Sequence, residues 1–425
     1  MAGDEGLAEE IARLGAADEA ARVAASDALA KRVERGEAVG AALEALGRAL
    51  SDENATVRGN AAWVFATLGQ QGVDLGPVMA ALAGALASPQ LNVARNVAWA
   101  VGQTAARADV TAALPELVAQ LGRDDTFANA RVALANAIAD GPAREAARRA
   151  VEEAFGRDGD GATRTRAALI LARDALARGD VGAVEARIRH ADWHARFGVA
   201  KALGEVAATS ALPAAAVGPL ASLLSDAEAA VRQAAATALV DAVEHGTDVT
   251  AALPALGGAL RDPELAVRKE AIWAAAMAAR RGTPLGPARA PLEACAADEA
   301  TRGNASLGLF FDDLRDGKRA AVEAQLGAAH GHTQFAAAYA LTEEAARTQD
   351  RALFESLLGR IRVGIADLSI SQGIAGALAD RQRRGDDAGW ALGVIQALIA
   401  ATTDPLVHTP LMGVLMNLQR ATGGG

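Results

Sequence analysis

Histidine is the residue type in this chain whose spacing could hold a metal ion. His190 and His194 are four residues apart with Asp192 between them, and a helix would place both imidazoles on one face. This pair falls where a loop is expected, and His330 and His332 flank a glycine in a predicted turn. Since neither pair is expected to lie in continuous helix, we predict no metal site.

Nucleophilic catalysis has no support in the residue types either. The single cysteine, Cys295, lies in an alanine-rich segment, which favours a buried small side chain over a reactive thiol. The sequence contains no G-x-x-x-x-G-K phosphate loop, no G-x-S-x-G elbow and no C-x-x-C pair. We therefore expect no catalytic residues, no cofactor and no enzyme activity.

The side chains that remain are positioned by an internal repeat of the form V-R-x-x-A-A-x-A-L. Copies follow one another at spacings of 30 to 37 residues, a period typical of stacked supersecondary units. Two linkers, Asp109–Pro115 and Asp248–Pro254, have the same sequence, which indicates internal duplication. Taking the first residue of the pattern as position 1, the twelve copies begin near Ala21, Val57, Val93, Ala130, Thr165, Ala195, Val231, Val267, Thr301, Thr333, Ile370 and Val407.

Each repeat is predicted to contain two helices, A and B. Helix A carries leucine and alanine at helical spacing, often with proline in its first turn, as at Pro77 and Pro254. An aspartate-bearing loop then leads into helix B near position 1. On helix B, positions 1, 5, 8, 9 and 12 share one face and form the predicted core, while small residues at positions 6 and 10 let neighbouring helices approach closely.

Position 2 of helix B is arginine in eight copies, and most of these copies have a loop aspartate just upstream. We interpret these residues as an Asp–Arg ladder that holds successive turns together. The arginines are Arg22, Arg58, Arg131, Arg166, Arg196, Arg232, Arg268 and Arg302, and the aspartates are Asp18, Asp52, Asp192, Asp226, Asp262 and Asp298.

The repeat resembles that of HEAT-repeat proteins, in particular the short bacterial and archaeal repeats of the phycobilin-lyase group. The resemblance implies an all-α fold, a right-handed α-solenoid of about twelve helix-turn-helix repeats, with helix A on the convex side and helix B on the concave side. We expect one continuous solenoid over residues 1–422 and a flexible tail at 423–425. HEAT-type hydroxylases that hold two irons use repeated His-Glu pairs, and none occurs here.

Composition narrows the expected partners and location. The formal net charge of −10 argues against a general nucleic-acid binder, because phosphate neutralisation needs clustered Lys and Arg. One cysteine indicates a reducing compartment, and the N-terminus lacks an apolar signal core, so we expect a cytoplasmic protein. The longest uncharged stretch, 206–225, is interrupted by Pro213 and Pro219, and no membrane span is expected.

Function is expected on helix-B positions 3, 4, 7, 11 and 14, which the stack does not need. Trp63 and Trp99 both occupy position 7 and each follows an asparagine by three residues, so that amide and indole share one stripe. Exposed aromatic residues of this kind dominate the energetic centres of protein interfaces. The predicted partner-binding residues are Asn60, Trp63, Arg95, Asn96, Trp99, Gln103, Asn136, Glu270, Trp273 and Tyr339.

These residues favour a non-catalytic scaffold or adaptor that binds a protein or peptide along its concave helix-B surface. A structural alternative has each indole packing over the small residues of the next repeat, with the asparagines forming an amide ladder. The resemblance leaves a phycobilin-lyase-like or other HEAT-type enzyme or chaperone open, and less favourably a HEAT-like DNA glycosylase. Met412 and Met416 near the C-terminus indicate a homodimer contact, unless the helix expected at 390–401 covers them.

Overall fold

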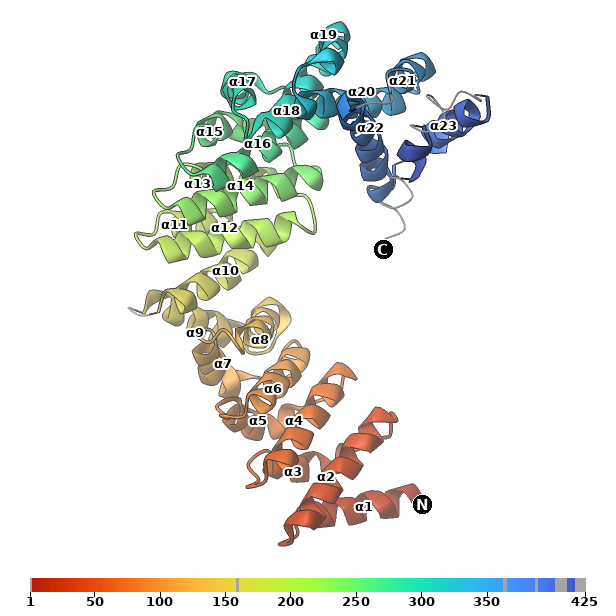
Figure 1. Ribbon diagram of the computed structural model, residues 1–425. Coiled ribbons are helices and arrows are strands. Elements are labelled where there is room, and N and C mark those ends of the chain that lie inside the picture. Colours follow the sequence, from red (N-terminus) through yellow and green to blue (C-terminus); the bar gives the residue numbers. More distant parts are fainter. Residues whose placement is uncertain (1, 158–159, 362–364, 387–388, 402–410, 417–425) are drawn as a thin grey trace. The chain divides into compact units, whose positions relative to one another are not determined.

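The computed structural model describes residues 2–157, 160–361, 365–386, 389–401 and 411–416, and every element in these ranges is helical (Figure 1). They group into two compact units, Met1–Ala202 and Leu203–Gly425, and the boundary falls within one helix, α12 (Trp193–Ala207). The last predicted repeat start, Val407, and the predicted tail at 423–425 lie outside the described residues. Among the helices described, none is both long and apolar enough to cross a membrane.

In the first unit, helices alternate between two layers as predicted. Each helix B packs against its own helix A and against the helix B of the next repeat, and successive A helices contact one another. The A helices are α1 (Ala2–Leu14), α3 (Leu43–Ala49), α5 (Met79–Leu86), α7 (Leu114–Gln120), α9 (Arg144–Gly156) and α11 (Val181–Ile188). The B helices are α2 (Glu19–Glu34), α4 (Ala55–Gln70), α6 (Leu91–Thr104), α8 (Phe127–Asp140) and α10 (Gly161–Ala177), followed by α12.

The second unit repeats this arrangement. Its A helices are α13 (Ala214–Leu223), α15 (Leu253–Ala259), α17 (Arg289–Ala297), α19 (Arg319–Ala324), α21 (Arg351–Leu358) and α23 (Gly389–Ala401). Its B helices are α14 (Ala229–Glu244), α16 (Leu265–Arg280), α18 (Arg302–Arg315), α20 (Gly331–Thr348) and α22 (Ile365–Arg383). Each of these B helices contains the predicted start of its repeat or follows directly after it, as α18 follows Thr301.

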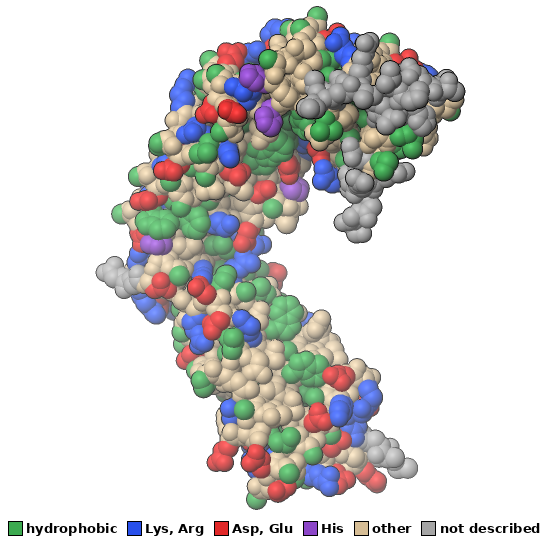
Figure 2. Space-filling view, viewed as in Figure 1, with side chains coloured by type: hydrophobic (Ala, Val, Ile, Leu, Met, Phe, Trp, Pro, Cys, Tyr) green, Lys and Arg blue, Asp and Glu red, His purple; other side chains and the backbone are tan. Residues whose placement is uncertain are grey.

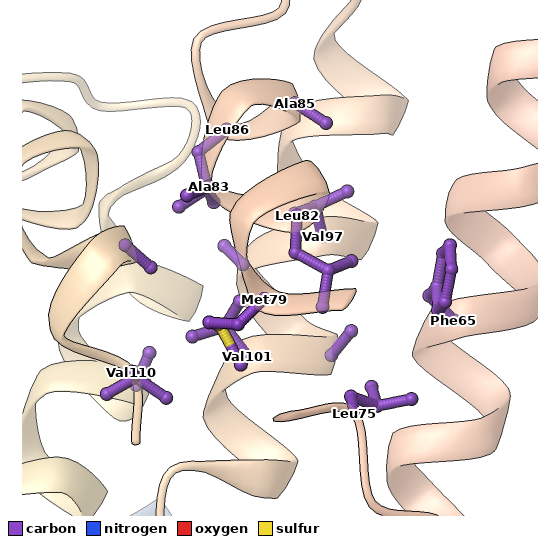
Figure 3. Close-up of a cluster of buried hydrophobic side chains, with 14 of the residues drawn as sticks. Phe65, Leu75, Met79, Leu82, Ala83, Ala85, Leu86, Val97, Val101 and Val110 are labelled. Atoms are coloured by element: carbon purple, nitrogen blue, oxygen red, sulfur yellow. The ribbon is translucent and has the colours of Figure 1, made fainter. Parts of the chain in front are cut away.

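The core lies between the two layers, where the predicted positions place it. Val57, Ala61, Val64, Phe65 and Leu68, at positions 1, 5, 8, 9 and 12 of the second copy, are all buried. Figure 3 shows Phe65 of α4 facing the apolar side chains of α5 and α6, including Leu82 and Val97. Since each helix B has one apolar face of this kind, a single repeat could not bury it alone.

The position-2 arginines form a ladder, but their carboxylate partner differs from the predicted one. Arg232 donates to the carbonyls of Asp226 and Ala227 in its own loop and, over 2.6 and 3.0 Å, to the carboxylate of Asp262 in the loop of the next repeat. Arg22 binds the carboxylate of Asp52 in the same way. At Arg22 and Arg232 the upstream loop thus supplies carbonyls and the following loop supplies the carboxylate, so these two arginines join neighbouring repeats. Arg58 donates to the side-chain oxygen of Gln90 in the following loop instead.

The fifth copy begins two residues earlier than predicted. Arg164 donates to the carboxylate of Asp192 in the next loop and to carbonyls of its own loop, which is the role of position 2. Arg166, which the sequence placed in that role, instead donates to Leu121 O and to Asp124 in the preceding repeat. Both Thr163-Arg164 and Thr165-Arg166 match the first two positions of the pattern, but only a start at Thr163 places Ala167, Ala168 and Leu171 at positions 5, 6 and 9.

Neighbouring B helices approach each other very closely at two mid-helix glycines that the sequence did not single out. A Cβ added to Gly198 of α12 would lie 2.2 Å from the carbonyl oxygen of Thr165 in α10, and one added to Gly373 of α22 would lie 2.5 Å from that of Phe335 in α20. Both glycines occupy position 4, whereas the predicted small contact residues occupy positions 6 and 10. Backbone approaches backbone at these points, so no larger residue fits without moving a helix.

Candidate functional site

The predicted stripe of amide and indole side chains lines a shallow hollow over α4 and α6 in the first unit. The hollow has a volume of about 440 Å³, and Asn60 and Trp63 of α4 meet Asn96 of α6 in its wall. Gln90 and Asn92, at the start of α6, complete the polar lining. Two adjacent repeats therefore contribute to one surface depression that is rich in amides and contains one aromatic ring.

Local capping sets the direction of α4 and so the face that these residues occupy. The Asn54 side chain accepts hydrogen bonds from the backbone N–H groups of Thr56 and Val57, at 2.7 and 3.2 Å. With Val57 buried as the first core residue, Asn60 and Trp63 fall on the opposite side of the helix, where both are half-buried. The cap and the core position together present amide and indole to the surface.

Gly59 lets the amides of the following repeat lie close to α4. A Cβ at Gly59 would approach the side-chain amide of Asn92 to 3.2 Å and that of Gln90 to 3.5 Å. Because Gly59 has no side chain, the amides of the neighbouring repeat lie close to the α4 backbone without filling the space above it.

The asparagines of this surface differ in how many of their hydrogen-bonding groups are already used. Asn60 donates to the hydroxyl of Ser26 in the preceding repeat at 3.0 Å, so its partner is a serine and not another asparagine. Asn96 forms no side-chain hydrogen bond to any described residue, and the same holds for Asn304 at the equivalent position in the second unit. No amide-to-amide bond joins Asn60, Asn96 and Asn304, so the amide ladder of the structural alternative does not form among them, and the Asn96 amide has both its donor and its acceptor available.

A second hollow adjoins the first and has an acidic character. It has a volume of about 660 Å³, lies over α2, and shares Thr56 and Asn60 with the hollow over α4 and α6. Its carboxylates are partly used within the fold, since Glu19 accepts from Asn54 and Asp27 pairs with Lys31 at 2.7 Å. Because both hollows are lined by Thr56 and Asn60, we treat them as adjoining parts of one surface over three B helices and call this surface the α2–α6 groove.

The other predicted residues of the first unit lie outside this groove. Arg95 donates to the backbone carbonyl of Asp125 at 2.7 Å, and Asn136 donates to that of Gly102 at 2.9 Å, so both tie neighbouring repeats together. Trp99 and Gln103 are half-buried on α6. They extend the same helix face beyond the groove rather than lining it.

Glu270, Trp273 and Tyr339 belong to the second unit and do not join the α2–α6 groove. Glu270 and Trp273 are half-buried on α16. Tyr339 is buried, with only 4 % of its surface exposed, and its hydroxyl donates to Asp380 at 2.5 Å. Its ring lies edge-on to Phe311, so the expectation that position 7 is free of the stack fails in the tenth copy.

Sequence reasoning missed Thr56, Gln90 and Asn92 as lining residues. Thr56 precedes position 1 of its repeat, and Gln90 and Asn92 lie at the loop and first turn of α6, where the repeat pattern assigns no outward face. The available signal was the run of amides, Gln90, Asn92 and Asn96, all in a single repeat. Gln90 and Asn92 line the groove because the stacking of repeats places the start of α6 beside α4.

His194 and Cys295, two of the residues considered for chemistry, both lie in contact with other groups of the fold. The His194 ring lies 2.8 Å from the Asp192 carboxylate and stacks on Trp193, and no group of three or more metal-ligating side chains occurs in the described ranges. Cys295 is buried in α17, donates to Leu260 O at 3.2 Å, and burial raises the pKa of its thiol. A buried, hydrogen-bonded thiol is the structural role that the sequence predicted.

Solved structures of karyopherins are similar to this chain in fold. Kap95p bound to RanGDP is 13% identical, with a TM-score of 0.54 over 97% of this chain and 62% of that chain. Kap121p bound to the extreme C-terminus of the protein phosphatase Cdc14p is 14% identical, with a TM-score of 0.54 over 98% of this chain and 50% of that chain. Kap95 in complex with Nup1 is 14% identical, with a TM-score of 0.55 over 98% of this chain and 62% of that chain. This chain thus spans about half to three-fifths of their length.

No family model and no curated protein sequence matches the chain. The likeness to karyopherin structures therefore concerns the fold, and it confirms the predicted all-α solenoid and, at the coarse level, its HEAT-like repeats. The finer resemblance to the phycobilin-lyase group finds no support among these structures. The fold class is that of a helical solenoid similar to the karyopherins.

Proposed function

We propose that this chain is a non-catalytic protein-binding solenoid that takes an extended segment of a partner protein into the α2–α6 groove. The main support is that Asn60, Trp63 and Asn96, from adjacent repeats, line one hollow. In addition, the Asn96 amide has no hydrogen-bonding partner among the described residues. A primary amide offers both a donor and an acceptor, as an extended peptide backbone does. Trp63 adds an aromatic surface of the kind that dominates interface energetics.

The known partners of the similar structures support a protein ligand. Kap121p is solved bound to the extreme C-terminus of Cdc14p and, in separate structures, to Ste12p, Nup53p and Pho4p, and Kap95 is solved with Nup1. These complexes show that a solenoid of this fold suits protein recognition, while the low identity leaves the partner of this chain open. The net charge of −10 also favours a protein over a nucleic acid as ligand.

Two further expectations remain part of the proposal. We place the protein in the cytoplasm, where a lone buried thiol such as Cys295 stays reduced. A homodimer through the C-terminal segment remains a prediction; in that segment Met412 is half-buried and Met416 is 47 % exposed.

Cross-linking tests where a partner segment lies. A random peptide library is selected against the full chain, and the enriched peptide is incubated with a variant that carries a photoreactive phenylalanine at Thr56, which lines both parts of the groove. The matched control carries the same group at Ala80, an exposed position on α5 in the helix-A layer. The proposal predicts cross-linking from Thr56 and none from Ala80. Equal cross-linking from both positions would contradict it.

A further inference from the structure

In the second unit, the carboxyl ends of four B helices, α14, α16, α20 and α22, line one hollow, and arginine side chains from the last three gather there. They line a hollow with a volume of about 890 Å³, large enough for a peptide segment or a small ligand. The arginines are Arg280, Arg281, Arg347, Arg381, Arg383 and Arg384. Four carboxylates share the lining, which leaves an excess of two positive charges in a chain whose net charge is −10.

The carboxylates deepest in this hollow are already fully paired. Glu343, whose side chain is 9 % exposed, lies between Arg381 at 3.2 Å and Arg384 at 2.8 Å. Asp380 accepts from the Tyr339 hydroxyl and from Arg383. These bonds make the floor a rigid base that holds the surrounding guanidinium groups in place.

Arg280 at the end of α16 stands apart from this network. It is half-buried and forms no hydrogen bond or ion pair with any described residue. Two neighbours are only partly used, because Arg281 donates to the backbone carbonyl of Glu244 and Arg347 pairs with Glu344 at an exposed site. A guanidinium carries five N–H donors, so several donors at the rim of the hollow lack partners in the fold.

An apolar surface lies beside these donors. Trp273 lines the same hollow seven residues before Arg280 on α16, a spacing that places both side chains on one face of the helix. The indole is half-buried, so part of its ring contributes to the wall. A ligand that combines negative charge with an apolar side chain would match both features.

The helix ends decide between kinds of anion. These four B helices present their carboxyl ends to the hollow, where the negative end of the helix dipole disfavours any anion, and most strongly a phosphate that concentrates two or more charges at one point. Carboxylates spaced along a peptide carry one charge each and can meet separate arginines, whose planar guanidinium groups fit them with two parallel hydrogen bonds. Spread arginines at helix carboxyl ends therefore favour an acidic peptide over a compact phosphate.

We propose that the arginine-lined hollow of the second unit binds an acidic peptide segment, with Arg280 pairing a carboxylate and Trp273 contacting an apolar side chain of the same segment. This site is separate from the α2–α6 groove, and neither proposal requires the other. The surplus of positive charge in this hollow favours acidic ligands, although the chain as a whole has a net charge of −10.

Fluorescence anisotropy with a defined pair of peptides tests this proposal. The probe is a short labelled peptide with alternating Glu and Leu, and its reference has Gln in place of every Glu. Arg280→Ala is expected to weaken binding of the acidic peptide by about fivefold or more, because a charge-assisted hydrogen bond to the peptide is lost. The variant should remain folded, since Arg280 has no hydrogen-bonding partner in the fold. Arg280→Lys should bind at an intermediate level because it retains the charge but loses the planar fork.

The control is Arg351→Ala, which removes an exposed arginine of α21 that pairs only with Glu355 on its own helix. Its affinity for the acidic peptide should equal that of the parent chain. Equal binding of the Glu and Gln peptides, or an Arg280→Ala variant that binds as the parent does, would overturn the proposal. Displacement of the peptide by inorganic pyrophosphate at a lower concentration than by free acidic peptide would also overturn it, because the hollow would then be a phosphate site.

Discussion

Arg232 and Asp262 belong to different repeats, yet two hydrogen bonds of 2.6 and 3.0 Å join the guanidinium of one to the carboxylate of the other. The Asp262 side chain is only 5 % exposed, and its carboxylate also accepts a hydrogen bond from the backbone N–H of Glu264 in its own repeat. One carboxylate therefore shapes its own loop and fixes the preceding repeat. The Arg22–Asp52 pair has the same geometry in the first unit.

Removing Arg232 should destabilise the second unit substantially. Arg232→Ala leaves Asp262 buried without its counter-charge, which we expect to lower the free energy of unfolding by about 3 kcal/mol. Urea denaturation followed by circular dichroism measures the change. Arg351→Ala, at an exposed pair in the same unit, should change it by less than about 0.5 kcal/mol. Similar losses in both variants would show that the inter-repeat pair has no special weight.

Stability should fall at acidic pH because of the same carboxylate. Burial opposes ionisation of Asp262, but hydrogen bonds from Arg232 and from the Glu264 backbone outweigh it and hold its pKa below the ordinary 3.8. A lowered pKa gives stability that is complete above the unfolded-state pKa and is lost as pH falls through the folded-state value. Thermal melts at neutral pH and below pH 4 should therefore differ less for Asp262→Asn than for the parent chain. An identical acid response would refute this assignment.

Glycine substitutions should have opposite effects at two positions of the first unit. Gly198→Ala places a Cβ 2.2 Å from Thr165 O and should cost about 1–3 kcal/mol, since α10 and α12 must separate. Gly84→Ala, on α5 with nothing within 4 Å, should stabilise by about 0.5–1 kcal/mol because alanine is the better helix former. Equilibrium unfolding of both variants provides the comparison, and a neutral Gly198→Ala would contradict the close approach.

Tyr339 is the only tyrosine in the chain, so its ionisation can be followed directly by ultraviolet absorbance. Burial and the hydrogen bond to Asp380 raise the pKa of Tyr339 above its ordinary value of 10. A raised pKa favours the neutral form, so the folded protein should show no tyrosinate near pH 10 and lose stability as pH rises further. Asp380→Asn should shift the titration to lower pH. Ordinary titration near pH 10 in the parent chain would place the ring at the surface.

The repeat pattern predicted the two-layer fold because its core positions depend only on helical periodicity. Val57 and Phe65 are buried where the wheel places them, and Asn60 and Trp63 emerge on the opposite face. Contacts between repeats were harder to predict. The sequence showed an aspartate upstream of Arg232, but only stacking could show that the next loop supplies the bound carboxylate.

Tyr339 shows why the outward face could not be predicted for every copy. Its position on the wheel matches that of Trp63, yet α22 approaches α20 so closely that the ring is covered. The glycines at 373 and 376 permit this, since a Cβ at Gly373 would lie 2.5 Å from Phe335 O and one at Gly376 would lie 3.6 Å from the Tyr339 ring. The arginine-lined hollow was missed for a similar reason, because its residues come from separate helix ends that only the stack brings together.

On the face shown in Figure 2, basic and acidic side chains are interspersed, as expected from a sequence in which Lys and Arg are mixed with Asp and Glu along the chain.

The affinity of a library-selected peptide for the parent chain and for Asn96→Ala tests the central claim most directly. Asn96 has no hydrogen bond within the described fold, so its loss should leave stability unchanged and weaken peptide binding by about fivefold, the loss of a hydrogen bond to the ligand. The matched control, Asn304→Ala, removes a position-4 asparagine from the second unit and should bind as the parent chain does. The account predicts that only Asn96→Ala and Trp63→Ala lose affinity. Unchanged affinity in Asn96→Ala would show that the α2–α6 groove is not the binding site.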